Sequence, residues 1–186
     1  MTPILITQPG LAFRRSLLAI IFSYAATSGH PFPFLVLKPY GQRRGLSDLS
    51  VNGNTFRAIN GAIDRIEAVD TSLSDLDRER FFQIQFQGNN FNNITTQSAN
   101  PLRLTHHQNS AATPWTIDTA RRLPFQAQCR DADTLIAKSP LVTASGARRH
   151  ALPYIELQYG PDKDQAAIVW PEAVKGKLGL QLRCDR

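Results

Sequence analysis

The clearest alternation of hydrophobic and polar positions lies in "RFFQIQFQG", residues 80–88. Its apolar residues Phe82, Ile84 and Phe86 alternate with glutamines. Successive side chains of a β-strand point to opposite faces, so a period of two predicts a strand. This strand would have one apolar face and one amide face.

Short apolar runs bounded by turn residues fill the last third of the chain, and a further run follows Pro31 and Pro33. Such runs, separated by pairs like Gly160-Pro161, are typical of an antiparallel sandwich, barrel or twisted sheet. The predicted strands cover residues 34–38, 125–129, 134–137, 154–159, 166–170 and 178–184.

Two segments instead favour helices. Residues 55–69 place apolar side chains at near-helical spacing, although alternation within "AIDRIEAV" leaves a strand open. Residues 14–25 also fit one apolar helix face, and Gly29 with Pro31 would end that helix. The apolar face of the first segment would consist of Phe56, Ile59, Ile63, Ile66 and Val69. The apolar face of the N-terminal segment would consist of Phe13, Leu17, Ile20, Ile21 and Tyr24.

The N-terminal run "RRSLLAIIFSYAATSG" has a second interpretation. Its Arg pair, apolar stretch and small residues resemble an export signal cleaved near Ala26. The stretch is shorter than the about 20 apolar residues that span a bilayer, which argues against a membrane span. Turn formers ahead of Arg14 are unlike a short charged leader, so we favour a packed helix of the mature protein.

The pattern as a whole predicts a β-rich α+β fold. We expect an antiparallel sheet, sandwich or barrel with an N-terminal helix and one further helix. Residues 1–30 would form an arm, and residues 31–186 a single β-rich domain, since 186 residues suit one domain. No internal repeat is recognised.

The amino-acid composition indicates a protein that makes contacts with other protein chains. Hydrophobic residues make up 42% of the chain and charged residues only 19%, below the roughly 25% of typical soluble domains. From Phe81 to Ile117 only Arg103 carries a formal charge. A long uncharged segment of this kind is expected to pack against something, and we predict it in or beside a subunit contact.

The chemistry of a catalytic or metal site is weakly represented. Two cysteines, Cys129 and Cys184, allow one disulfide in an oxidising compartment or two buried thiols in a reducing one. His106 and His107 are adjacent, and on an extended segment they would point apart. We therefore predict no catalytic residue, no metal site and no cofactor.

Arginine provides most of the formal net charge of +6, since sixteen Arg stand against five Lys. Arg doublets could bind phosphates or the acidic surface of another subunit, for which residues 64–79 offer carboxylates. Subunit pairing is favoured because stacking aromatics are scarce near the doublets. The predicted interface residues are Arg43, Arg44, Arg121, Arg122, Arg148, Arg149, Asn89, Asn90, Phe91 and Trp115.

The sequence thus favours a non-enzymatic structural subunit of a larger assembly, such as a virus capsid, tail or surface structure. Its partners would be copies of itself or other subunits, in a virion or extracellular setting. A basic nucleic-acid-binding domain and an exported domain with an unread enzymatic role are the alternatives.

Overall fold

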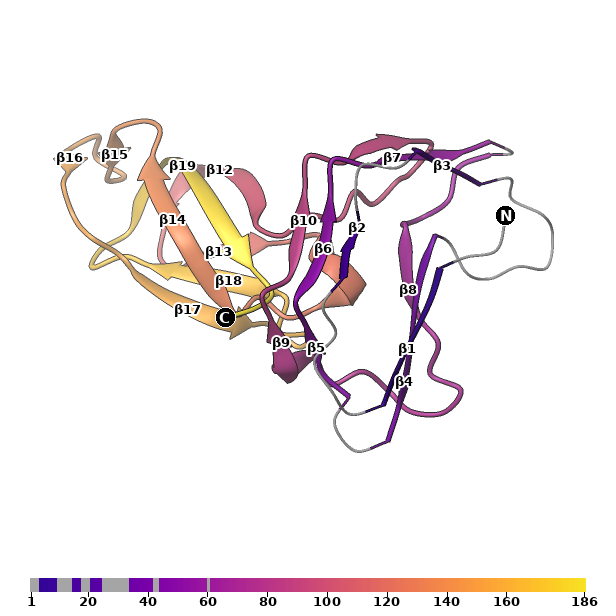
Figure 1. The fold of residues 1–186 in the computed structure, drawn as a ribbon. Helices are drawn as coiled ribbons and strands as arrows, with labels where there is room; N and C mark the ends of the chain where they lie inside the picture. Colours follow the sequence, from indigo (N-terminus) through magenta and orange to yellow (C-terminus); the bar gives the residue numbers. More distant parts are fainter. Residues whose placement is uncertain (1–3, 10–14, 18–20, 25–33, 42–43, 60) are drawn as a thin grey trace.

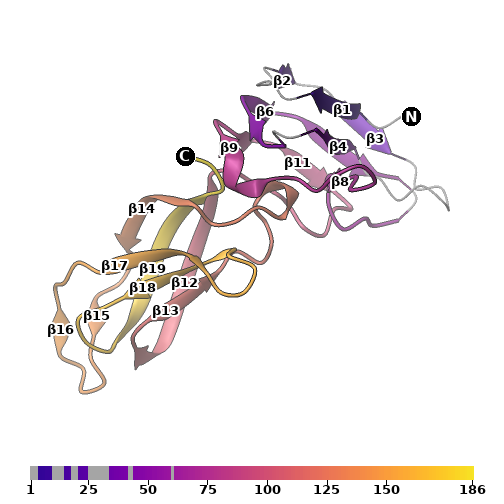
Figure 2. The same ribbon diagram turned by 90° about the horizontal axis from the view of Figure 1, so that it is seen from below.

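The computed structural model describes residues 4–9, 15–17, 21–24, 34–41, 44–59 and 61–186. Two β-rich lobes lie side by side: β1 to β11 form one and β12 to β19 the other (Figure 1). The C-terminus lies where the lobes meet, and β1 lies on the side of the first lobe away from the sandwich (Figures 1 and 2).

The first lobe is a parallel β-solenoid, in which the chain passes repeatedly through the same three sheets. Partners in neighbouring coils are separated by roughly 31 to 35 residues, a period typical of solenoids. The sheets consist of β1 (Ile4–Pro9), β4 (Leu35–Tyr40) and β8 (Glu67–Val69); β2 (Arg15–Leu17), β6 (Leu49–Asn52) and β10 (Gln85–Gln87); and β3 (Ile21–Tyr24), β7 (Thr55–Ala58) and β11 (Asn90–Asn92). A shorter parallel pair joins β5 (Leu46–Ser47) to β9 (Phe81–Phe82).

Stacked side chains explain why these short segments are strands. Phe56 of β7 faces Phe91 of β11 in register, and their rings stack with centroids 5.9 Å apart. Asn89 accepts a hydrogen bond from the Asn54 amide at 2.9 Å and donates to the Val51 carbonyl at 2.7 Å. Asn89, within the uncharged and amide-rich part of the sequence, therefore satisfies backbone groups at the turns between coils.

Both predicted helices are wrong. Residues 14–25 contain β2 and β3, and residues 55–69 contain β7 and β8. Parallel pairing with neighbouring coils replaces the helical hydrogen bonds, and β-branched residues such as Ile21 and Thr55 suit a strand better than a helix. In the described part of the chain, the helical elements are the 3₁₀ turns η1 (Arg78–Arg80) and η2 (Pro124–Gln126).

Two strand predictions also need correction. Phe82 is 46% exposed, whereas Phe81 is buried, because the positive φ of Gln83 (53°) interrupts the alternation between β9 and β10. Residues 125–129 begin in η2 and contain no strand. There Phe125 has a φ of 56°, and its ring packs edge-on against Phe86 with centroids 5.9 Å apart.

The second lobe consists of two antiparallel sheets, and here the predicted antiparallel architecture is confirmed. One sheet has β12 (Leu102–Ala112), β19 (Val174–Arg183), β14 (Asp131–Ala137), β15 (Leu141–Val142) and β16 (Arg148–Arg149); the other has β13 (Trp115–Asp118), β18 (Gln165–Val169) and β17 (Tyr154–Tyr159). Their inner faces pack as a sandwich around Trp115, Trp170 and Leu180.

A single hydrophobic core runs through both lobes. The sandwich closes the end of the solenoid at its last coil: Phe86 and Asn100 exchange two backbone hydrogen bonds, and η2 packs on β8. The predicted boundary at residue 30 falls outside the described residues, and β1 to β3 pair with the coil that follows. No helix in the described part is long and apolar enough to cross a membrane.

Candidate interaction site at the sandwich tip

The end of the sandwich farthest from the solenoid is formed by the hairpin β15–β16 (Figure 1). Leu141 faces Arg149 and Val142 faces Arg148 across this hairpin. Gly146 provides the positive φ (86°) of its turn and donates to the Thr143 carbonyl at 3.0 Å. The predicted doublet Arg148-Arg149 is thereby held on an exposed strand at the extremity of the molecule.

The hairpin approaches β19 closely at Gly176. A Cβ there would lie 3.0 Å from the Leu141 side chain and 3.1 Å from the Pro140 carbonyl oxygen. A glycine at this position therefore allows β15 to pair with β19, which occurs through Val142 and Lys175. This close approach places Pro140 and Leu141 at the base of the tip.

A recess of about 540 Å³ opens between the hairpin and the extended segment that follows it. Leu152 in this segment is 93% exposed, the most exposed large hydrophobic side chain among the described residues. A leucine left in water beside an apolar recess is unfavourable unless a partner covers it. The lining residues are Ala137, Ser139, Pro140, Leu141, Arg148, Arg149, His150, Ala151 and Leu152.

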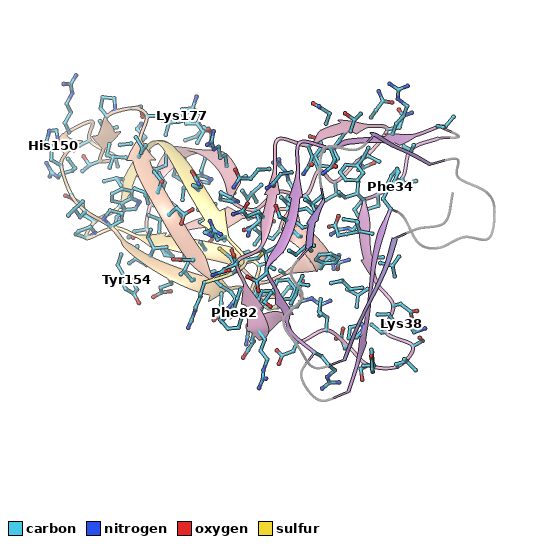
Figure 3. All side chains as sticks on the ribbon, viewed as in Figure 1. Phe34, Lys38, Phe82, His150, Tyr154 and Lys177 are labelled. Carbon is cyan, nitrogen blue, oxygen red and sulfur yellow. The ribbon has the colours of Figure 1, made fainter. Side chains whose placement is uncertain are left out.

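The rim of the recess is basic. Arg149 forms an ion pair with Glu172, which fixes its guanidinium against the loop before β19. Arg148 is exposed and makes no ion pair with any residue that the structure describes. Figure 3 shows His150 at this same end of the sandwich, whereas Tyr154 lies on β17 away from it. The site therefore combines an apolar base with an available cation.

The other predicted arginines do not converge on this site. Arg43 lies outside the described residues, and the half-buried Arg44 accepts a backbone hydrogen bond from Asp77 at 3.0 Å. Arg121 donates to the Gln126 side chain at 2.6 Å. Arg122 donates to the Gln97 carbonyl at 3.3 Å and lines a separate pocket of about 330 Å³ between the lobes.

The remaining predicted interface residues mostly serve the fold. Asn89 and Phe91 connect neighbouring coils of the solenoid, while Asn90 lies exposed on β11. Trp115 is 1% exposed, and its indole nitrogen donates to the Ala112 and Val174 carbonyls at 2.9 and 3.1 Å. Its ring therefore packs the sandwich core and presents no surface to a partner.

Two buried carboxylates join the lobes, and neither was singled out in the sequence. The Asp185 carboxylate accepts hydrogen bonds from the Ile84 amide at 2.6 Å and from the Asn100 side chain at 2.7 Å. The Arg183 guanidinium donates two further hydrogen bonds to it, each at 3.0 Å. The only sequence clue is position: Asp185 follows an apolar strand at the end of the chain. It is the main polar link between β19 and the last coil.

The second buried carboxylate, Glu67, lies on β8 beneath η2. One of its carboxyl oxygens accepts a hydrogen bond from the Ser98 hydroxyl at 2.6 Å. The same oxygen accepts two longer hydrogen bonds, from the Arg65 guanidinium and from the Phe125 amide, each at 3.3 Å. The other oxygen has no hydrogen-bond partner among the residues that the structure describes. Burial raises the pKa of Glu67 to about 7, although the contacts with Ser98 and Arg65 act in the opposite direction.

Groups suited to nucleophilic or metal chemistry are dispersed. Cys129 and Cys184 are both buried free thiols, and burial raises the pKa of Cys129 to about 12. His106 is half-buried against Trp115, whereas His107 faces solvent on the other side of β12. Among the described residues, no three His, Cys, Asp or Glu side chains are grouped to hold a metal ion.

No family model, no curated protein and no solved structure matches the chain.

Proposed function

We propose that the protein is a non-catalytic assembly subunit that binds another protein chain through the recess at the sandwich tip. The observation that carries the proposal is the 93% exposure of Leu152 beside an apolar recess and beside Arg148, which has no ion pair within the described part of the chain. Protein interfaces combine an apolar centre with a polar rim in which arginine is enriched. Arg148 would select a partner that carries a carboxylate next to an apolar side chain.

The position of the recess supports this role. It lies at the far end of the sandwich from the solenoid, so a partner bound there does not disturb the joint between the lobes (Figure 1). The lining contains no carboxylate that could orient His150 as a catalytic base, among the residues described. A docking role accounts for both the exposed leucine and the basic rim.

Replacing Leu152 with aspartate tests this proposal. The variant should lose assembly, with a dissociation constant raised about 10- to 100-fold, because the apolar contact is lost and a carboxylate enters the recess. Light scattering over a concentration series would then report the monomer mass of 20.7 kDa where the wild type is larger. Tyr154→Asp is the matched control, since Tyr154 is 66% exposed but lies outside the recess.

The arginine doublet separates protein docking from nucleic-acid binding. Exchanging Arg148 and Arg149 for serine should lower the assembly mass and leave any weak nucleic-acid binding almost unchanged. If these arginines bind phosphate instead, wild-type affinity for RNA or DNA would fall steeply with salt, and the serine variant would have a flatter salt dependence. A tight nucleic-acid complex at physiological salt, lost in the serine variant, would contradict the docking proposal.

A further inference from the structure

The sandwich tip carries a strong excess of positive charge. Residues 137–152 and 170–178 contain five basic side chains and one acidic side chain, and the acidic one is already paired with Arg149. An uncovered apolar recess within such a surface favours an acidic partner. The charged residues are Lys138, Arg148, Arg149, Lys175, Lys177 and Glu172.

A segment with the matching chemistry occurs in the same chain. The loop between β8 and η1, residues 70–77, reads "DTSLSDLD" and contains three carboxylates and no basic residue. Leu73 at its centre is 63% exposed. The Asp75 side chain pairs with Arg78 of the same copy at 3.5 Å but is still 65% exposed, and Asp77 pairs with Arg80 at 3.1 Å. This acidic loop therefore presents an apolar side chain with a carboxylate two residues away.

The acidic loop is anchored at both ends, so it can present Leu73 without a large ordering cost. The Asp70 amide donates to the Leu37 carbonyl at 2.7 Å, and the Asp70 carboxylate pairs with Lys38 at 3.0 Å. At the other end Leu76 is buried, and Asp77 caps η1 through the Glu79 amide at 3.1 Å. A preorganised loop loses less conformational entropy on binding.

The tip and the acidic loop lie at opposite ends of the molecule. Figure 3 labels His150 at the tip and Lys38, the ion-pair partner of Asp70, at the far side of the solenoid. In Figure 1 the loop after β8 is at the lower right, away from β15 and β16. One copy therefore cannot fill its own recess, whereas a second copy can do so.

We propose that the chain associates head to tail, with Leu73 of one copy in the tip recess of the next and Asp75 against Arg148. The inference rests on the proposed docking function and names the partner as a second copy of this chain. The two surfaces differ, so the contact is heterologous and generates a ring or an open filament. The recess of about 540 Å³ is large enough for a leucine side chain and its flanking backbone.

Two variants test this pairing, each with one surface altered. Leu73→Arg damages the loop and keeps the tip, whereas Leu152→Asp damages the tip and keeps the loop. Each alone should be monomeric in light scattering where the wild type is assembled. Mixed at equal concentration, they should form a complex of two chains and nothing larger, because one intact tip meets one intact loop. Ile59→Arg, at a residue 55% exposed on the solenoid, is the control and should assemble normally.

The outcomes separate this inference from the docking function on which it rests. If Leu152→Asp becomes monomeric while Leu73→Arg assembles like the wild type, the tip is an interface and the acidic loop is not its partner. A mixture that stays monomeric would also overturn the head-to-tail pairing. If the wild type is monomeric at every concentration, the head-to-tail pairing is wrong and a partner of the recess must be a different protein. If neither variant changes the mass of an assembled wild type, both proposals are wrong.

Discussion

Replacing Asp185 with alanine is expected to lower the free energy of unfolding by about 3 to 5 kcal/mol, because a buried, paired charge is removed. Asp185 is fully buried and accepts hydrogen bonds from the Ile84 amide and from Asn100. Without it, the buried Ile84 amide loses its partner and Asn100 keeps only its hydrogen bond to the Ile84 carbonyl, while Arg183 loses both of its shorter carboxylate contacts. Urea unfolding followed by circular dichroism measures the change.

Asp133→Ala is the matched control for this experiment. Asp133 also pairs with Arg183, at 3.5 Å, but its side chain is 34% exposed and lies on the surface of β14. Exposed ion pairs contribute about 0 to 1 kcal/mol, so this variant should stay within that range. Equal losses in the two variants would mean that Asp185 does not hold the sandwich to the last coil.

Several strands of the sandwich could be predicted because they form apolar or alternating runs bounded by turn residues, whereas β12 and β13 lie in a part of the uncharged stretch where no strand was predicted. The predicted range 154–159 matches β17, and the predictions at 166–170 and 178–184 overlap β18 and β19. In the solenoid, several strands are three or four residues long, so alternation barely repeats before a turn. Over a window of 12 to 15 residues, two such strands with their turn imitate a helical period. This explains why residues 55–69 have the pattern of a helix although they contain β7 and β8.

The repeat of the solenoid was nevertheless present in the sequence. "VNGNTF", residues 51–56, and "FQGNNF", residues 86–91, share glycine, asparagine and phenylalanine at matching positions. The structure places Phe56 opposite Phe91 and joins Asn54 to Asn89. A comparison of the chain with itself would have revealed this period. It would also have assigned Asn89 and Phe91, within the uncharged stretch, to contacts between coils.

Only half of the candidate site could be read from the sequence. The doublet Arg148-Arg149 stands out between turn residues, and charge is visible without a fold. The apolar part was hidden, because Leu141 and Leu152 are 11 residues apart and resemble ordinary core positions. Whether a leucine is buried depends on which strands cover it. At this site the outcome depends on the pairing of β15 with β19, which are far apart in the sequence.

The joint between the lobes also makes the protein sensitive to pH through Glu67. This carboxyl is fully buried under η2, and burial raises its pKa to about 7 from an ordinary value of 4.5. In the unfolded chain the group ionises at the ordinary value. Between these two values the unfolded state has lost the proton that the folded state still holds. The free energy of unfolding therefore falls as pH rises from about 4.5 to about 7.

Exchanging Glu67 for glutamine should remove this pH dependence. At about 1.4 kcal/mol per pKa unit, the wild type should lose roughly 3 kcal/mol relative to the Gln variant between pH 4.5 and 7.5. Urea unfolding of both proteins across that range measures the difference, in which the other titrating groups cancel. Ser98→Ala provides a second check: the Ser98 hydroxyl favours the ionised carboxyl, so its removal should extend the loss of stability to higher pH. A constant difference between wild type and Gln variant from pH 4.5 to 7.5 would show that Glu67 is ionised throughout, with Arg65 compensating its burial.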